Sequence, residues 1–205
     1  MNSVHALMTL SPVIPVLTIE DAAWARPIAR ALVAGGLCVL EVTLRTPAGL
    51  EAIAEMAKVE GAVVGAGTVL NPLDVQASLE AGAQFIVSPG LTEPLAKAAL
   101  AADVAFLPGV ATAADIMRGL DLGLNHFKFF PAEAAGGRKA LASLASPFHQ
   151  VRFCPTGGVT LASMPDWLAM PSVLCVGGSW LVPAGPPDEA AIHRSAAEAV
   201  RRAKG

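Results

Sequence analysis

A lysine placed among phenylalanines is the feature of this sequence that most needs a chemical explanation. Lys128 lies in the segment HFKFFPAE (residues 126–133), with Phe127 and Phe129 on either side and Phe130 next. Lysine is a strongly hydrated cation and is rarely buried without a partner. Its neutral amine, however, can attack a ketone and form a Schiff base, and burial among apolar side chains favours the neutral form. The segment therefore indicates covalent chemistry on a carbonyl substrate.

Two further charged side chains occur in a second apolar run, CVLEVTLR at residues 38–45. Side chains alternate between the two faces of a strand, so Glu41, Thr43 and Arg45 share one face. Charges on a face covered by helices would be desolvated without partners, and we expect this face, like Lys128, to point into the interior. A buried Lys–Glu pair without a function is the competing interpretation. Several polar groups that converge at strand ends favour a functional site instead.

Short apolar runs rich in β-branched residues recur along the chain and would supply these strands. They begin at Val13, Cys38, Ala62, Phe85, Ala105, His126, Arg152 and Val173. Successive starts lie 20 to 26 residues apart, which is room for one strand, one helix and two short loops. Thr46-Pro47 and Asn71-Pro72 each pair a helix-capping residue with a proline suited to the first helical position.

Eight such units predict the α/β class and a (β/α)8 TIM barrel, with residues 1–205 as a single domain. A doubly wound open sheet is the alternative. Its dinucleotide-binding fingerprint is only partly matched by GAGTVL at residues 65–70, which lacks the third glycine. Eight units are also more than such a sheet normally uses, so the barrel is favoured.

Glycine pairs follow the last two expected strands. Gly157 and Gly158 come after the seventh, and Gly177, Gly178 and Ser179 come at the end of the eighth. In barrels, the loops at these two positions frequently hold a phosphate through backbone N–H groups. A single glycine pair usually marks only a tight turn, but two pairs at the two expected places favour a phosphate site.

Composition argues against several other classes of protein. Hydrophobic residues make up 54% and charged residues 15%, the net charge is −3, and the only basic cluster is Arg201, Arg202 and Lys204. A nucleic-acid-binding surface would need a basic stripe with aromatic residues. No apolar run approaches the roughly 18 residues of a membrane helix. The three cysteines lie in apolar runs without CxxC spacing, as expected for reduced thiols in a cytoplasmic protein.

Metal chemistry is not expected either. The four histidines are scattered and show none of the spacings by which histidines ligate a metal. His126 shares a strand face with Lys128 but precedes it, and core packing is the expected role for that side chain.

Six segments together resemble the class I 2-keto-3-deoxy-6-phosphogluconate (KDPG) aldolases, a family also described as 4-hydroxy-2-oxoglutarate (KHG) aldolases. The segments are EVTLRT (41–46), VGAGTVLNP (64–72), VSPGLTEP (87–94), FKFFPAE (127–133), RFCPTGG (152–158) and GGSWLVP (177–183). The resemblance extends from about Pro12 to Pro183. It implies a homotrimeric (β/α)8 barrel of bacterial central metabolism that needs no metal or organic cofactor.

The resemblance also implies roles for individual residues. Lys128 corresponds to the Schiff-base lysine and Glu41 to the acid/base residue. The implied substrate-binding residues are Arg45 and Thr68 at the pyruvate carboxylate, Pro89 and Phe130 at the pyruvyl pocket, Thr156 at the sugar-acid chain, and Gly157, Gly158, Gly178 and Ser179 at the distal phosphate.

The implied reaction is cleavage of the phosphorylated 2-keto acid KDPG to pyruvate and glyceraldehyde 3-phosphate in the Entner–Doudoroff pathway, with KHG as a second substrate. The FFPAE and CPTGG forms favour the gluconate over the galactonate substrate. Two alternatives stay open: a barrel isomerase that uses Glu41 as base without a covalent adduct, and a non-catalytic sugar-phosphate sensor. One departure from the family is the segment before Pro12, which is shorter than in many members; these carry an extra helix that closes the lower end of the barrel.

Overall fold

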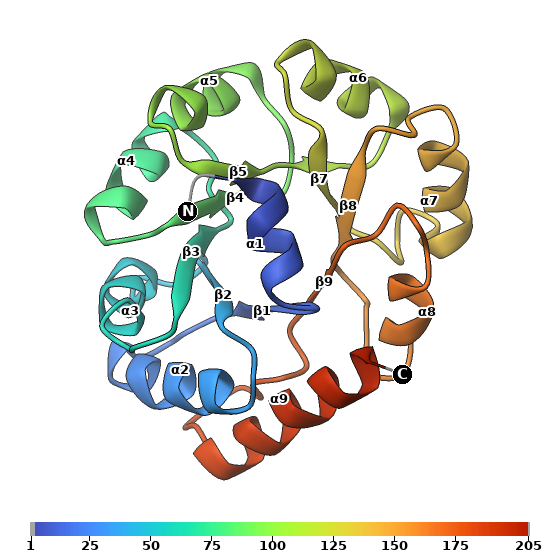
Figure 1. Ribbon diagram of the computed structural model, residues 1–205. Helices are drawn as coiled ribbons and strands as arrows, with labels where there is room; N and C mark the ends of the chain where they lie inside the picture. Colours follow the sequence, from blue (N-terminus) through green and yellow to red (C-terminus); the bar gives the residue numbers. More distant parts are fainter. Residues whose placement is uncertain (1–2, 205) are drawn as a thin grey trace.

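The computed structural model describes residues 3–204, in which strands and helices alternate along the chain. The strands are β1 (Val13–Leu17), β2 (Val39–Thr43), β3 (Val63–Gly67), β4 (Phe85–Val87), β5 (Ala105–Leu107), β6 (Gly109–Val110), β7 (His126–Phe129), β8 (Arg152–Pro155) and β9 (Val176–Gly178). The helices are α1 (Val4–Leu10), the 3-10 helix η1 (Ala22–Trp24), α2 (Ala25–Ala34), α3 (Gly49–Met56), α4 (Pro72–Glu80), α5 (Glu93–Ala101), α6 (Ala113–Asp121), α7 (Gly137–Ala145), α8 (Met164–Leu168) and α9 (Glu189–Ala203). Figure 1 shows α2 to α9 arranged around the strands.

The strands pair in parallel and form a curled sheet. Their hydrogen-bonded order is β5-β4-β3-β2-β1-β9 in one part and β6-β7-β8 in the other. Parallel bridges join Phe153 to Val173 and Thr156 to Gly177, and these bring β8 beside the segment that contains β9. The order follows the chain without the reversal of a doubly wound sheet, which favours the barrel over that alternative.

Each of the eight predicted apolar runs contains a strand, and the fifth run contains two. Pro108 divides that run into β5 and β6, because proline has no N–H with which to continue a ladder. The helix start predicted at Asn71 is confirmed, since its side chain accepts hydrogen bonds from the N–H groups of Leu73 and Asp74. The start predicted at Thr46-Pro47 is wrong: α3 begins at Gly49, and the Thr46 hydroxyl donates instead to the carbonyl of Ile19.

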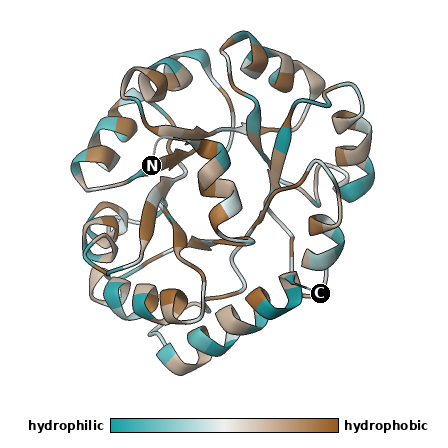
Figure 2. Ribbon diagram, viewed as in Figure 1, coloured by the Kyte–Doolittle hydropathy of each residue, from teal (hydrophilic) through white to brown (hydrophobic). Residues whose placement is uncertain are grey.

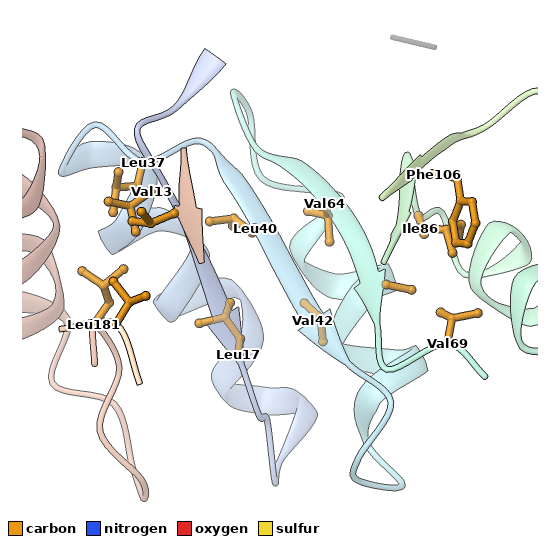
Figure 3. Close-up of a cluster of buried hydrophobic side chains, with 14 of the residues drawn as sticks. Val13, Leu17, Leu37, Leu40, Val42, Val64, Val69, Ile86, Phe106 and Leu181 are labelled. Carbon is orange, nitrogen blue, oxygen red and sulfur yellow. The ribbon is translucent and has the colours of Figure 1, made fainter. Parts of the chain in front are cut away.

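The main core lies between the curled sheet and the surrounding helices. Figure 3 shows part of this core, in which strand residues such as Leu40, Val42 and Val64 belong to one cluster of buried hydrophobic side chains. Figure 2 shows the same arrangement by hydropathy, with mainly hydrophobic strands near the centre and hydrophilic residues along the outer helices. The removal of this apolar surface from water is the main force that holds the helices on the sheet.

A second buried cluster lies inside the curled sheet, at the end where the strands begin. Leu7 and Met8 of α1 pack there with Val39 and Phe85, the first residues of β2 and β4. In Figure 1, α1 crosses the centre of the ring of strands. The short segment before Pro12 therefore does form a helix, and this helix covers the end of the sheet where the strands begin.

His126 connects this helix to β7. Its Nε2 lies 3.1 Å from Nδ1 of His5 on α1, and its Nδ1 lies 2.7 Å from Oδ1 of Asn125. The expectation that His126 packs in the core is wrong, because the side chain is half-buried and hydrogen-bonded at the rim. Burial lowers the pKa of His126, and the nearby His5 and Arg152 act in the same direction.

Candidate active site

Lys128 and Glu41 form a buried pair inside the curled sheet. Lys128 of β7 donates from Nζ to Glu41 of β2, at 3.0 Å from Oε1 and 3.4 Å from Oε2. The side chains are only 4% and 3% exposed. On either side of Lys128, the residues in register are Gly109, which has no side chain, and Cys154, whose side chain is small. The structure thus brings together two residues that the sequence places 87 positions apart.

The phenylalanines around Lys128 divide between two environments. Phe130 lies beside the amine, with the ring centroid 5.2 Å from Nζ. Phe127 and Phe129 point the other way into the main core, where Phe129 packs against Trp167 of α8 with ring centroids 6.5 Å apart. This division is what the alternation of side chains along a strand predicts. Phe130 is therefore the aromatic residue of this segment that shapes the surroundings of the amine.

Gly67 was not among the predicted site residues, although it supports the position of Glu41. A Cβ built on Gly67 would overlap the carboxylate of Glu41, which lies against the bare Cα on the neighbouring strand. The sequence signal for this contact was a glycine at the end of a strand, which often marks a close approach by another group. Gly67 makes the space that the Glu41 side chain occupies.

Arg45 and Thr68 lie next to each other just past the ends of β2 and β3. Nε of Arg45 donates to Oγ1 of Thr68 at 3.0 Å. Thr68 adopts a left-handed backbone conformation with φ of 59°, which is uncommon for a residue with a branched side chain. Arg45 is exposed, so its guanidinium can reach an anionic ligand in the mouth of the fold.

A cavity of about 90 Å³ opens between the loops that follow β8 and β9. Seven predicted site residues line it: Arg45, Phe130, Thr156, Gly157, Gly158, Gly178 and Ser179. The other lining residues are Val16 and Val159, which were not predicted, and Gly177, which belongs to the predicted glycine pair of the eighth strand. The Phe130 ring beside Lys128 and the two glycine loops therefore line one cavity, as expected for a site that binds a small carbonyl compound with an anionic tail.

Gly157 and Gly158 have φ values of 99° and 83°, so the loop that they form depends on glycine. Thr156, the residue before them, is buried, and its hydroxyl donates to the carbonyl of Cys154 at 3.3 Å. Gly177 makes room for Thr156, because a Cβ there would overlap the threonine side chain. These contacts fix the approach of β8 to the cavity.

Pro89 lies slightly apart from this group. It follows β4, is half-buried, and does not line the 90 Å³ cavity. Its carbonyl lies against Gly109, the neighbour of Lys128 in register. Pro89 therefore contacts β6, the strand that pairs with the strand of Lys128.

Residues 3–204 contain neither a metal-binding cluster nor a membrane-spanning helix. Among these residues, no group of three or more His, Cys, Asp and Glu side chains is arranged to hold a metal ion. No helix in the same part of the chain has the length and apolar character needed to cross a membrane.

The curled parallel sheet, the buried amine–carboxylate pair and the adjoining cavity define the class: an α/β enzyme scaffold with the groups for Schiff-base chemistry at the carboxyl ends of its strands. The comparisons give the family. The family model for KDPG and KHG aldolase matches residues 4–195, and the chain belongs to this family.

Two relatives illustrate the relationship. The 2-dehydro-3-deoxy-phosphogluconate aldolase of Zymomonas mobilis is 64% identical over 199 residues, which cover 97% of this chain and 96% of the relative. The KHG/KDPG aldolase of Escherichia coli K12 is 54% identical over 207 residues, which cover 99% of this chain and 97% of the relative.

Solved structures of relatives agree with the fold. A crystal structure of the Zymomonas mobilis ZM4 aldolase with 3-phosphoglycerate superposes with a TM-score of 0.96 at 64% identity, covering 98% of this chain and 96% of that one. The KDPG aldolase of Legionella pneumophila, with pyruvate captured at low pH as a covalent carbinolamine intermediate, gives a TM-score of 0.87 at 42% identity, with coverage of 98% and 96%.

Proposed function

We propose that this chain is a class I aldolase that cleaves KDPG to pyruvate and glyceraldehyde 3-phosphate through a Schiff base on Lys128. The observation that carries the proposal is the buried contact of 3.0 Å between Lys128 Nζ and Glu41 Oε1. Phe130, whose ring lies beside Nζ, also lines the cavity formed with the glycine loops. Family membership supports it, since the relatives described above are aldolases for this type of substrate.

The reaction begins when Nζ of Lys128 attacks the C2 ketone and water is lost to give an imine. Glu41, directly or through a water molecule, takes the proton from the C4 hydroxyl as the C3–C4 bond breaks. The electrons of that bond move into the imine and leave an enamine, while the C4 hydroxyl becomes the aldehyde of glyceraldehyde 3-phosphate. Protonation at C3 and hydrolysis of the imine then release pyruvate and free Lys128. The carbinolamine of the Legionella relative supports this route, because a carbinolamine precedes an imine.

The remaining residues divide between the two ends of the substrate. Arg45, whose Nε donates a hydrogen bond to Thr68, is proposed to hold the pyruvate carboxylate. Phe130 and Pro89 shape the pyruvyl pocket, and Thr156 contacts the chain between the two ends. The distal phosphate is assigned to the loops of Gly157, Gly158, Gly178 and Ser179, whose glycines let backbone N–H groups approach an anion. The 3-phosphoglycerate in the Zymomonas structure supports binding of a phosphorylated acid by such a site.

Cleavage of KHG to pyruvate and glyoxylate is the second proposed activity. The Escherichia coli relative carries both substrates in its name, KHG/KDPG aldolase. Both substrates share the pyruvyl half that meets Lys128, Glu41 and Arg45, and KHG lacks the phosphate. The isomerase and sensor alternatives are disfavoured, because the relatives are aldolases and a sensor has no need of a buried amine beside a carboxylate.

We further propose that the curled sheet closes into a (β/α)8 barrel in a single domain. The bridges between β8 and the β9 segment support closure on one side, and the continuity of β5 and β6 across Pro108 supports it on the other.

The family resemblance favours a homotrimer. The three cysteines are free thiols, which favours a cytoplasmic location.

The test is an assay in which lactate dehydrogenase reduces the released pyruvate and consumes NADH. Purified wild-type chain should consume NADH with KDPG, and Lys128→Met should reduce kcat by more than about 10³-fold because the covalent route is lost. Circular dichroism should show that the variant is folded. A folded Lys128→Met protein with near wild-type turnover would overturn the proposal.

A further inference from the structure

The loop that follows β7 holds the loop of Gly157 and Gly158 by two backbone hydrogen bonds. The N–H of Ala132 donates to the carbonyl of Thr156 at 2.7 Å, and the N–H of Glu133 donates to the carbonyl of Gly157 at 3.0 Å. These contacts continue the pairing of β7 with β8 past the last residues of the two strands. The loop after β7 therefore fixes where the carbonyls of Thr156 and Gly157 point.

The side chain of Glu133 continues this support beneath Gly158. A Cβ built on Gly158 would lie 2.6 Å from Cγ and 2.7 Å from Cβ of Glu133, so the two residues are packed closely. The carboxylate then accepts a hydrogen bond at 3.2 Å from Nε1 of Trp167, which is fully buried on α8. Glu133 thus links three elements: the loop after β7, the glycine loop and the helix that follows it.

Charge makes this arrangement unexpected if the glycine loop binds a phosphate. A carboxylate next to a phosphate site repels the ligand, and an uncharged side chain of similar size would avoid that repulsion. A role in positioning the loop explains why a hydrogen-bond acceptor occupies this place. The indole N–H also directs one carboxylate oxygen towards α8.

We infer that Glu133 is a positioning residue for the phosphate-binding loop. Together with Trp167 it holds Gly157 and Gly158 in the left-handed conformations, φ of 99° and 83°, in which they can receive a phosphate. The ligand class is the phosphate monoester of a sugar acid. This inference rests on the proposed function, because it assigns the phosphate to this loop.

Kinetics with two substrates test the inference. Glu133→Ala removes the side-chain contacts with Gly158 and Trp167 and keeps the backbone hydrogen bond to Gly157. It should raise KM for KDPG about fivefold, an effect expected for one lost hydrogen bond, and should weaken competitive inhibition by inorganic phosphate similarly. For KHG, which has no phosphate, KM should change by less than about twofold. Glu133→Gln keeps an oxygen that Trp167 can donate to and removes the charge, so KM for KDPG should stay within about twofold of wild type or fall.

Glu60→Ala serves as the matched control, because Glu60 is an exposed glutamate in the loop before β3, at the opposite end of the strands from the glycine loops. The inference is overturned if Glu133→Ala leaves both KM values unchanged or raises them equally, or if Glu133→Gln behaves like Glu133→Ala. If Glu133→Ala does not fold, Trp167→Phe takes its place: it removes the indole N–H that donates to Glu133, keeps an aromatic ring, and should raise KM for KDPG more than KM for KHG. An unchanged KM for KDPG in that variant overturns the inference. Wild-type chain that cleaves neither substrate would instead overturn the proposed function, and this inference with it.

Discussion

The carboxylate of Glu41 lies against the bare Cα of Gly67 on the neighbouring strand. Thr43 pairs with Gly67 in the ladder, so Glu41, two residues earlier on β2, reaches Gly67 diagonally. The same carboxylate meets Nζ of Lys128 at 3.0 Å from the other side of the interior. A position without a side chain therefore sets how far Glu41 can extend towards the amine.

Gly67→Ala should disable the enzyme while leaving the fold intact. The added methyl group would displace the Glu41 carboxylate, and misplacement of a catalytic group by about 1 Å can cost about 10²-fold in rate. We expect kcat to fall by that order. Gly90→Ala is the control, since a Cβ at Gly90 meets no atom within 4 Å. Equal kcat values for the two variants would contradict this role of Gly67.

Glu41→Gln should separate proton transfer from binding. The amide is nearly the same shape and can still contact Lys128, but it cannot accept the C4 hydroxyl proton. We expect kcat to fall by about 10²- to 10⁴-fold, the usual range for a general base, with KM within about threefold of wild type. Steady-state kinetics with KDPG measure both values. A loss confined to KM would show that Glu41 only binds substrate.

Arg45→Ala should act mainly on binding. Arg45 is exposed, unlike the buried Lys128–Glu41 pair, and its Nε donates to Oγ1 of Thr68 at 3.0 Å. Loss of a charged hydrogen bond to the carboxylate should raise KM by about tenfold or more and change kcat much less. Arg194→Ala, which removes an exposed arginine from α9, is the matched control and should leave both constants unchanged. A fall in kcat alone would argue against this assignment.

The lowered pKa of His126 should make stability depend on pH. The pKa of His126 is lowered by burial first and then by His5 and Arg152, so the unfolded chain binds a proton before the folded chain does. Stability should therefore be lost as the pH falls below about 6.5, the ordinary histidine pKa. Because half of the side chain is in water, the effect should stay below about 1 kcal/mol.

Urea unfolding at pH 7.5 and 5.5 measures this effect. His126→Gln should show a smaller loss of stability between the two pH values than wild type, and His193→Gln, an exposed histidine on α9, should match wild type. If His126→Gln lost as much stability on acidification as wild type, another group would have to be responsible.

The pairing of Lys128 with Glu41 could be predicted from the sequence because it depends on one local rule, the alternation of side chains along a strand. The eight strands were located for a similar reason, since each apolar run is short and bounded by loop residues. The capping of α4 by Asn71 is also a local property, which the side chain decides within three residues.

Contacts between distant segments could not be read in this way. Thr46 was expected to begin a helix, but its hydroxyl finds the carbonyl of Ile19 on another strand-end loop. His126 was expected to pack in the core, but α1 brings His5 to it from 121 residues away. Glu133 and Trp167 show no local pattern that would join them, and their contact depends on the way the loops after β7 and β8 meet.

Borohydride reduction in the presence of pyruvate tests the central claim most directly. Intact mass and peptide mapping should find one reduced pyruvyl adduct, on Lys128 and on no other lysine. Glu41→Gln should still form it, and Lys128→Met should not. A folded wild-type protein that forms no adduct, or an adduct on a different lysine, would contradict the assignment of Lys128 as the Schiff-base residue.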